Sequence, residues 1–235
     1  MAGLGRKVFT AGDVLTASDV QNYMMDQSVM YFAGTAARSS AIATPTTGMT
    51  SYIGTTGTAS IPQIETYTGS QWQTPYGATL VANVSFSAAS SISINNVFNS
   101  TYDNYMVVHN ITASSATVIR NRLRVSGTDN SSSNYLRGGM YVGLFANSVF
   151  SSTNNTTEAF FTLGSTSATV GFGGVLNFIA PFQTQYTKIT SHSGGADLGV
   201  GMCVFNGTTS FDGFSLYPDA GTLTGTIRVY GLRNS

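Results

Sequence analysis

Charged residues are scarce in this sequence. Lysine, arginine, aspartate and glutamate make up 9 % of the 235 residues, against roughly 25 % in an ordinary soluble protein. Ten basic residues balance ten acidic ones, so no net field draws the chain to nucleic acid or to an anionic membrane. We therefore expect no nucleic-acid partner. Sparse charge and 42 % apolar residues favour a β protein whose surfaces are largely covered by neighbouring molecules.

Cysteine and histidine are almost absent, which limits metal and redox chemistry. The single Cys203 cannot form an internal disulfide, and its apolar surroundings predict a small buried hydrophobe. His109 and His192 fall in different predicted strands, and neither has a second ligand at a spacing that suits zinc. We expect no metal and no cofactor, and we interpret His109 as a core or half-buried residue.

Long apolar runs are also missing. No stretch of about 18 apolar residues occurs, so we expect no membrane insertion. The opening MAGLGRKVFTAGDV lacks the apolar region of a secretory signal peptide, which predicts synthesis in the cytoplasm.

The few carboxylates of the C-terminal two thirds do not form an obvious catalytic pair. Most of them stand at turn positions, as in Phe211-Asp212-Gly213 and Pro218-Asp219-Ala220-Gly221, where turn formation explains them. Glycoside hydrolysis needs two carboxyl groups held close together. We therefore predict no catalytic residues and a protein that is not an enzyme.

What is present is a long series of short strands. From Ala78 onward, apolar and polar residues alternate between breaks of Gly, Ser, Asn and Thr. The predicted strands are 79–86, 90–97, 104–112, 117–125, 135–145, 157–163, 170–180, 184–191, 198–205, 209–217 and 222–232. Regular strands without intervening helices predict an antiparallel β-sandwich of the jelly-roll kind over residues 78–235.

The clearest alternation lies in residues 102–127. Tyr105, Val107, His109 and Ile111 share one face of the first strand, and the polar break 113–116 separates it from the second. This pattern predicts two antiparallel strands paired as a hairpin within a larger sheet.

The second of these strands carries a row of arginines. Spacing of two places Arg120, Arg122 and Arg124 on one face. Such a row could bind a phosphate or a sugar carboxylate, pair with acidic groups across a subunit interface, or simply face water. The sequence leaves these three alternatives open.

The first 44 residues predict an extended arm with one short helix. Thr16 or Ser18 can cap the helix, Asp19 suits its first turn, and it should end near Phe32. Its apolar stripe has no partner within the segment, which favours contact with sister subunits or another protein. The stripe consists of Val20, Tyr23, Met24, Met30 and Tyr31.

A small unit is expected between this arm and the sandwich. Residues 33–50 are small and polar and predict a linker, and a two-stranded unit follows that ends at the only tryptophan. Trp72 is expected to anchor packing or docking rather than to stack on a sugar. The predicted divisions are residues 1–44, 45–77 and 78–235.

Several short motifs resemble those of virion proteins of tailed bacteriophages. The phrase "F-x-x-G-x-V-L-T-A-x-D-V" occurs from Phe9 to Val20, and an "A-x-R" motif places its arginine at Arg38. "G-M-x-x-Y" and "Y-x-G-x-x-W" motifs end at Tyr52 and Trp72. The C-terminal part is similar through Tyr102-Asp103-Asn104-Tyr105, Arg122-Leu123-Arg124 and Gly225-Thr226-Ile227-Arg228-Val229-Tyr230-Gly231.

The resemblance implies a structural protein of the virion, forming a homotrimer, with an N-terminal module that mounts on other virion proteins. The motifs do not fix the place in the virion, and we predict a minor tail or tail-fibre protein whose distal sandwich faces the host surface and its glycans. The alternative is a capsid decoration or cement protein that braces the head. A carbohydrate-active enzyme is a third possibility, which the missing carboxylate pair argues against.

Overall fold

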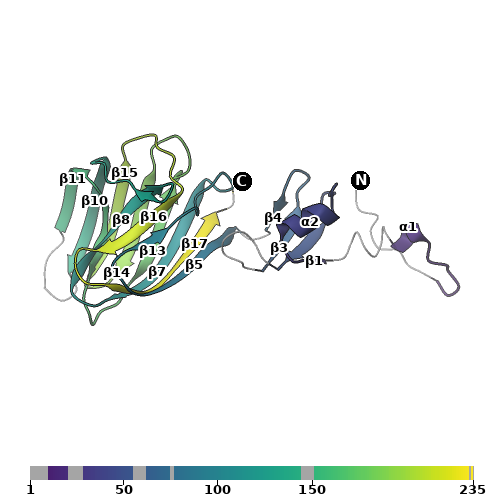
Figure 1. The fold of residues 1–235 in the computed structure, drawn as a ribbon, viewed down its shortest axis with the longest axis horizontal. Helices are drawn as coiled ribbons and strands as arrows, with labels where there is room; N and C mark the ends of the chain where they lie inside the picture. Colours follow the sequence, from purple (N-terminus) through teal and green to yellow (C-terminus); the bar gives the residue numbers. More distant parts are fainter. Residues whose placement is uncertain are drawn as a thin grey trace. The chain divides into compact units, whose positions relative to one another are not determined.

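The computed structural model divides the chain into two compact units, residues 1–77 and 78–235 (Figure 1). It describes residues 10–20, 29–54, 62–74, 77–143, 151–232 and 234.

The C-terminal unit is an antiparallel β-sandwich, which confirms the predicted mostly β fold class. An eight-stranded sheet and a five-stranded sheet form its two layers (Figure 1). The strands are β5 (Ala78–Ala89), β6 (Ile92–Ile94), β7 (Asn104–Ala113), β8 (Thr117–Val125), β9 (Thr128–Asp129), β10 (Tyr135–Gly143), β11 (Ser151–Glu158), β12 (Phe161–Thr166), β13 (Phe172–Ile179), β14 (Lys188–Gly194), β15 (Asp197–Phe205), β16 (Gly213–Pro218) and β17 (Leu223–Leu232).

The strand order is that of a jelly roll with insertions. One sheet contains the order β5-β17-β7-β13 and the other the order β6-β16-β8-β12, and the chain crosses between them along its length. Two Greek keys arranged as paired four-stranded sheets define the jelly roll. The hairpins β10–β11 and β14–β15 lengthen the first sheet, and β9 adds to the second beside β8.

The predicted hairpin of residues 102–127 is wrong in its pairing. Strand β7 lies between β13 and β17, whereas β8 lies in the other sheet between β12 and β16. Both strands bury one face, as their alternation predicted: Val107 and Leu123 are fully buried. The break at 113–116 therefore carries the chain from one layer to the other. The alternation of apolar and polar residues determines which face of a strand is buried, but it does not determine which strand lies beside it.

Several other predicted strands have different bounds. Residues 157–163 span the end of β11 and the start of β12, β14 and β16 begin only at Lys188 and Gly213, and the strand predicted over 90–97 is limited to Ile92–Ile94. Phe160, between β11 and β12, and Tyr186, before β14, are aromatic residues of loops that sequence patterning alone assigned to strands.

Aromatic side chains fill the space between the two sheets. Phe98 packs against Phe178 of β13 and Phe214 of β16, with ring centroids 5.1 and 5.8 Å away. Phe178 and Phe214 are themselves 5.0 Å apart. These contacts join strands of opposite layers, so the core lies between the sheets.

A buried tyrosine ties β10 to β8 at one end of this core. The Tyr135 hydroxyl accepts a hydrogen bond from the Leu123 amide and donates to the Asn130 carbonyl, both at 3.0 Å. Burial of a tyrosine is stabilising when its hydroxyl finds such partners. This residue therefore fixes the inserted hairpin to the second sheet.

The N-terminal unit contains a four-stranded sheet of order β1-β2-β3-β4 and two short helices. Its elements are α1 (Ala17–Asp19), β1 (Met30–Phe32), α2 (Thr35–Ala41), β2 (Thr50–Ile53), β3 (Gln63–Tyr67) and β4 (Trp72–Gln73). Strands β1 and β2 are parallel and the other pairs are antiparallel. Thr16 caps α1 through a capping box with Asp19, as the sequence predicted for one of two candidate caps.

Two sequence predictions for this unit are corrected. The predicted helix does not extend to Phe32, because Met30–Phe32 forms a strand paired with β2. Residues 33–50 are not simply a linker, because they contain α2. The predicted division at residue 44 cuts through this sheet. Pairing with residues 21 positions away overrides the local helical spacing, as tertiary context commonly does.

Candidate functional site

A buried ion pair organises the N-terminal unit. The Arg38 guanidinium of α2 contacts the Glu65 carboxylate of β3, and both side chains are buried. Glu65 also accepts a hydrogen bond of 2.8 Å from the Gln63 amide. Burial lowers the pKa of Arg38, but an arginine stays protonated in proteins. Two opposite charges removed from water in this way hold α2 against the sheet.

An aromatic pair completes this cluster. The Arg38 guanidinium carbon lies 4.6 Å from the centroid of the Trp72 ring, and Trp72 packs on Tyr67 at 5.5 Å. A guanidinium over an indole ring is the most favourable cation–π arrangement. The residues that carry the "A-x-R" and "Y-x-G-x-x-W" motifs therefore meet in one place, and packing explains their presence.

The opposite face of the small sheet presents apolar side chains to solvent. Tyr31, Tyr52 and Ile64 occupy facing positions on β1, β2 and β3. They are 68, 38 and 37 % exposed, and the two tyrosine rings stack at 5.9 Å. We call these three residues the tyrosine row. Among the described residues of this unit, Ile53 is the one buried apolar side chain.

The predicted docking residues are only partly brought together. Tyr31 lies in the tyrosine row, Trp72 packs on Arg38, and Met30 is half-buried on β1. Val20 is half-buried at the end of α1, while Tyr23 and Met24 lie outside the described residues. Tyr52 and Ile64 were missed by the sequence analysis, although the alternation within Thr50–Ile53 and Gln63–Tyr67 could have indicated them.

The arginine row on β8 is held by partners within the chain. Arg120 forms two bonds of 2.5 and 2.6 Å to the Asp219 carboxylate and a third of 2.9 Å to the Thr162 hydroxyl. Its guanidinium also covers the Phe160 ring at 4.0 Å. Asp219 lies 99 residues further along the chain, so this neutralising carboxylate could not be recognised from local sequence.

The other two arginines are engaged in the same way. Arg122 donates to the Ala159 carbonyl at 3.0 Å and covers the Tyr217 ring at 4.9 Å. Arg124 donates to Asn95 at 2.8 Å and also contacts Asp129 and the Gly127 carbonyl. The row thus braces loops against the five-stranded sheet, which explains these residues without an anionic ligand.

Removing one member of this row is expected to have a small effect. Arg120→Ala should lower the free energy of unfolding of the C-terminal unit by about 1 kcal/mol, because partly exposed ion pairs contribute little. Urea unfolding followed by circular dichroism measures the change, with the exposed Arg228→Ala as the matched control. Saturable binding of phosphate by the native chain, lost in Arg122→Ala, would restore the ligand interpretation.

Of the two histidines and the single cysteine of the sandwich, His109 and Cys203 lie in its core. His109 is 2 % exposed and stacks on Phe172 at 5.1 Å. Burial lowers the pKa of His109 from 6.5 to about 4, an effect that the backbone of Phe172 offsets only in part. Burial raises the pKa of the Cys203 thiol to about 12. The prediction that Cys203 is a small buried hydrophobe is confirmed.

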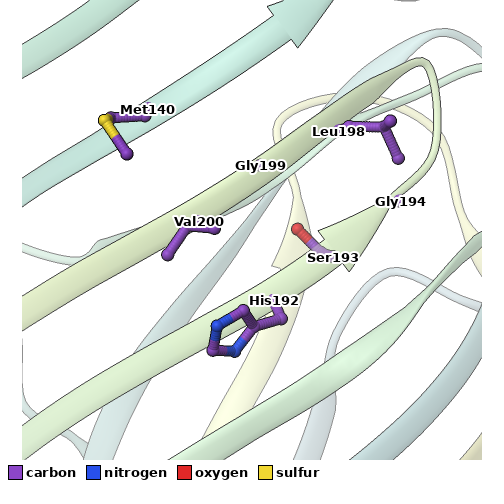
Figure 2. Close-up of a pocket in the computed structure, with 7 residues that line it drawn as sticks. All are labelled: Met140, His192, Ser193, Gly194, Leu198, Gly199 and Val200. Atoms are coloured by element: carbon purple, nitrogen blue, oxygen red, sulfur yellow. The ribbon is translucent and has the colours of Figure 1, made fainter.

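A shallow apolar hollow lies on the outer surface of the eight-stranded sheet (Figure 2). Its volume is about 460 Å³, and Met140, Val200 and His192 form a row across β10, β15 and β14. Ser193 and Gly194 of β14 and Leu198 and Gly199 of β15 complete the lining. The hollow offers contact area for an apolar surface but few polar groups to orient a small ligand.

The part of the chain that the structure describes contains no group of three or more His, Cys, Asp or Glu residues that could hold a metal ion. None of its helices is long and apolar enough to cross a membrane.

No protein-family model matches the chain, and a search of curated proteins finds no match.

Proposed function

We propose that this chain is a structural protein of a tailed-bacteriophage virion, a minor tail or tail-fibre protein. Its N-terminal unit attaches to other virion proteins, and its β-sandwich is the distal part that faces the host surface. The resemblance of the short motifs supports this proposal, and so does the division into a small unit and a larger sandwich. No catalytic step is part of the proposal.

The observation that carries the proposal is the incomplete packing of the small unit. Its described residues bury one apolar side chain and an ion pair, while the tyrosine row faces solvent. A unit of this size cannot obtain much stability from so small a core. Covering the tyrosine row with a neighbouring protein would supply the missing apolar contact, as expected of an attachment module.

A head decoration protein is the second candidate. The apolar outer surface around Met140, Leu198 and Val200 favours it, because a bracing protein contacts neighbours through its sandwich as well as its arm. The two candidates differ in where the protein lies and in how many copies are present.

Immunoelectron microscopy of intact virions, with an antibody raised against residues 78–235, separates the candidates. Label confined to the tail, at a few to a few dozen copies, is the result expected for a tail-fibre protein. Label spread over the head at hundreds of copies would establish the decoration protein instead. Virions that carry no label after the antibody has recognised the free protein would refute both.

The attachment role of the tyrosine row is tested in the same system. Tyr31→Ser combined with Tyr52→Ser should abolish incorporation into virions, because both exposed rings of the row are lost. Tyr186→Ser is the matched control, since Tyr186 is an exposed tyrosine of the C-terminal unit. Normal incorporation of the double variant would show that attachment uses another surface.

A further inference from the structure

We infer that the outer surface of the eight-stranded sheet, centred on β10, β15 and β14, is where copies of this chain contact one another. This surface, here called the β15 face, consists of Leu136, Met140, Leu198, Val200 and Met202 with His192 among them. The inference rests on the proposed function in one respect. A structural protein that is present in several copies in one particle is expected to contact other copies of itself.

The β15 face is a continuous apolar surface. Leu198, Val200 and Met202 alternate along β15, and Leu136 and Met140 occupy the same face of β10. All five are exposed, with Met202 reaching 61 %. Figure 2 shows Met140, Val200 and Leu198 among the side chains that line the hollow. A contiguous group of this kind marks a contact surface more often than isolated apolar residues do.

The two outer surfaces of the sandwich differ in charge. The five-stranded sheet carries Arg120, Arg122 and Arg124, which are held by carboxylates, carbonyls and rings of the same chain. On the β15 face the described side chains carry no acidic group, and its cations stand only at the borders, Lys188 opposite Val204 and Arg228 of β17 opposite Val108. The charged surface is suited to water, and the neutral one to burial.

This neutrality favours a second copy as the occupant. When two copies of one surface meet, charges of a single sign find no opposite charge on the partner, so self-contact is easiest where such charges are missing. The β15 face meets that condition, because its two cations, Lys188 and Arg228, stand at its borders. A partner of strong charge would find no complementary group here.

The available area also matches a stable contact. The surface continues from β10, β15 and β14 over the half-buried Val175 of β13 and Val108 of β7. Five strands at about 4.8 Å spacing and about 30 Å length give roughly 700 Å² per copy. Specific interfaces bury about 800 Å² per partner.

The test is the self-association of the full chain, measured by sedimentation velocity over a range of concentrations. Leu198→Glu and Met202→Glu each place a carboxylate on the β15 face and should weaken self-association at least tenfold. Met202→Ser removes apolar surface without adding charge and should weaken it less. Ser93→Glu is the matched control, because Ser93 is exposed on β6 of the other sheet. Circular dichroism verifies that each variant is folded.

Three results would overturn the inference. They are a native chain that stays monomeric at every concentration, self-association that survives both glutamate variants, and self-association weakened equally by Ser93→Glu. The proposed function fails separately, through virions that lack the protein. A chain that associates through the β15 face but is absent from virions would keep this inference and remove the proposed function.

Discussion

Arg38→Met is expected to unfold the N-terminal unit under conditions that leave the C-terminal unit folded. The substitution keeps most of the side-chain volume but leaves Glu65, which is 7 % exposed, without its cation. Removing one partner of a buried ion pair typically costs about 3–5 kcal/mol, because the other charge remains buried and uncompensated. A unit with so little buried apolar surface cannot absorb that loss.

The only tryptophan makes this prediction easy to measure. Trp72 lies 4.6 Å from the Arg38 guanidinium, so its fluorescence reports on the N-terminal unit alone. Urea titrations should show an early Trp72 transition in the variant, and circular dichroism should show the sandwich unfolding at the native midpoint. The exposed Arg228→Met is the control for loss of an arginine elsewhere.

A second variant separates the charge effect from lost packing. Arg38→Met combined with Glu65→Met removes both charges and should recover most of the lost stability. A Trp72 transition in Arg38→Met that matches the native protein within about 0.5 kcal/mol would show that the ion pair does not stabilise the unit.

The sandwich is expected to lose stability in mild acid because of His109. The pKa of this histidine is about 4 in the folded chain and about 6.5 when exposed, so the unfolded chain binds the proton more tightly. The stabilising contribution is fully present above pH 6.5 and is lost progressively as the pH falls toward 4. A difference of 2.5 pKa units corresponds to about 3 kcal/mol.

Comparison of variants isolates this histidine from the carboxylates, which also titrate in acid. His109→Leu should show a shallower loss of unfolding free energy between pH 7 and pH 4, measured by urea unfolding and circular dichroism. The ring nitrogens make no well-formed hydrogen bond, and the weak interaction with the Phe172 backbone is the polar contact that the leucine would remove. His192→Gln, at an exposed position, is the control. Parallel pH profiles for His109→Leu and the native chain would contradict the prediction.

The sequence analysis was most accurate for the burial of each strand. Tyr105, Val107 and Ile111 alternate with less buried residues, and all three are fully buried in the structure. Successive side chains of a strand point to opposite faces, so a strand that buries one face shows alternating apolar and polar residues in its sequence. The mostly β class and the buried Cys203 could be predicted for the same reason.

Ion pairs between residues that are distant in the sequence could not be predicted. Arg120 meets Asp219, and Arg38 meets Glu65, across 99 and 27 positions of the chain. A local pattern shows that a charge is present but not what lies opposite it, so the arginine row remained ambiguous. Tyr52 and Ile64 of the tyrosine row were missed, and so was the β15 face, because each surface gathers residues from several strands.

Residue patterning alone therefore determined that this chain forms a β-sandwich and which positions of its best-defined strands face inward. The tertiary structure decided which strands became neighbours: it placed β7 and β8 in different layers and turned Met30–Phe32 into a strand. The sequence does not determine strand neighbours because the hydrophobic effect is non-directional: an apolar strand face gains as much from packing against one apolar layer as against another of similar size. Strand neighbours, ion pairs and exposed contact surfaces depend on how the whole chain closes on itself.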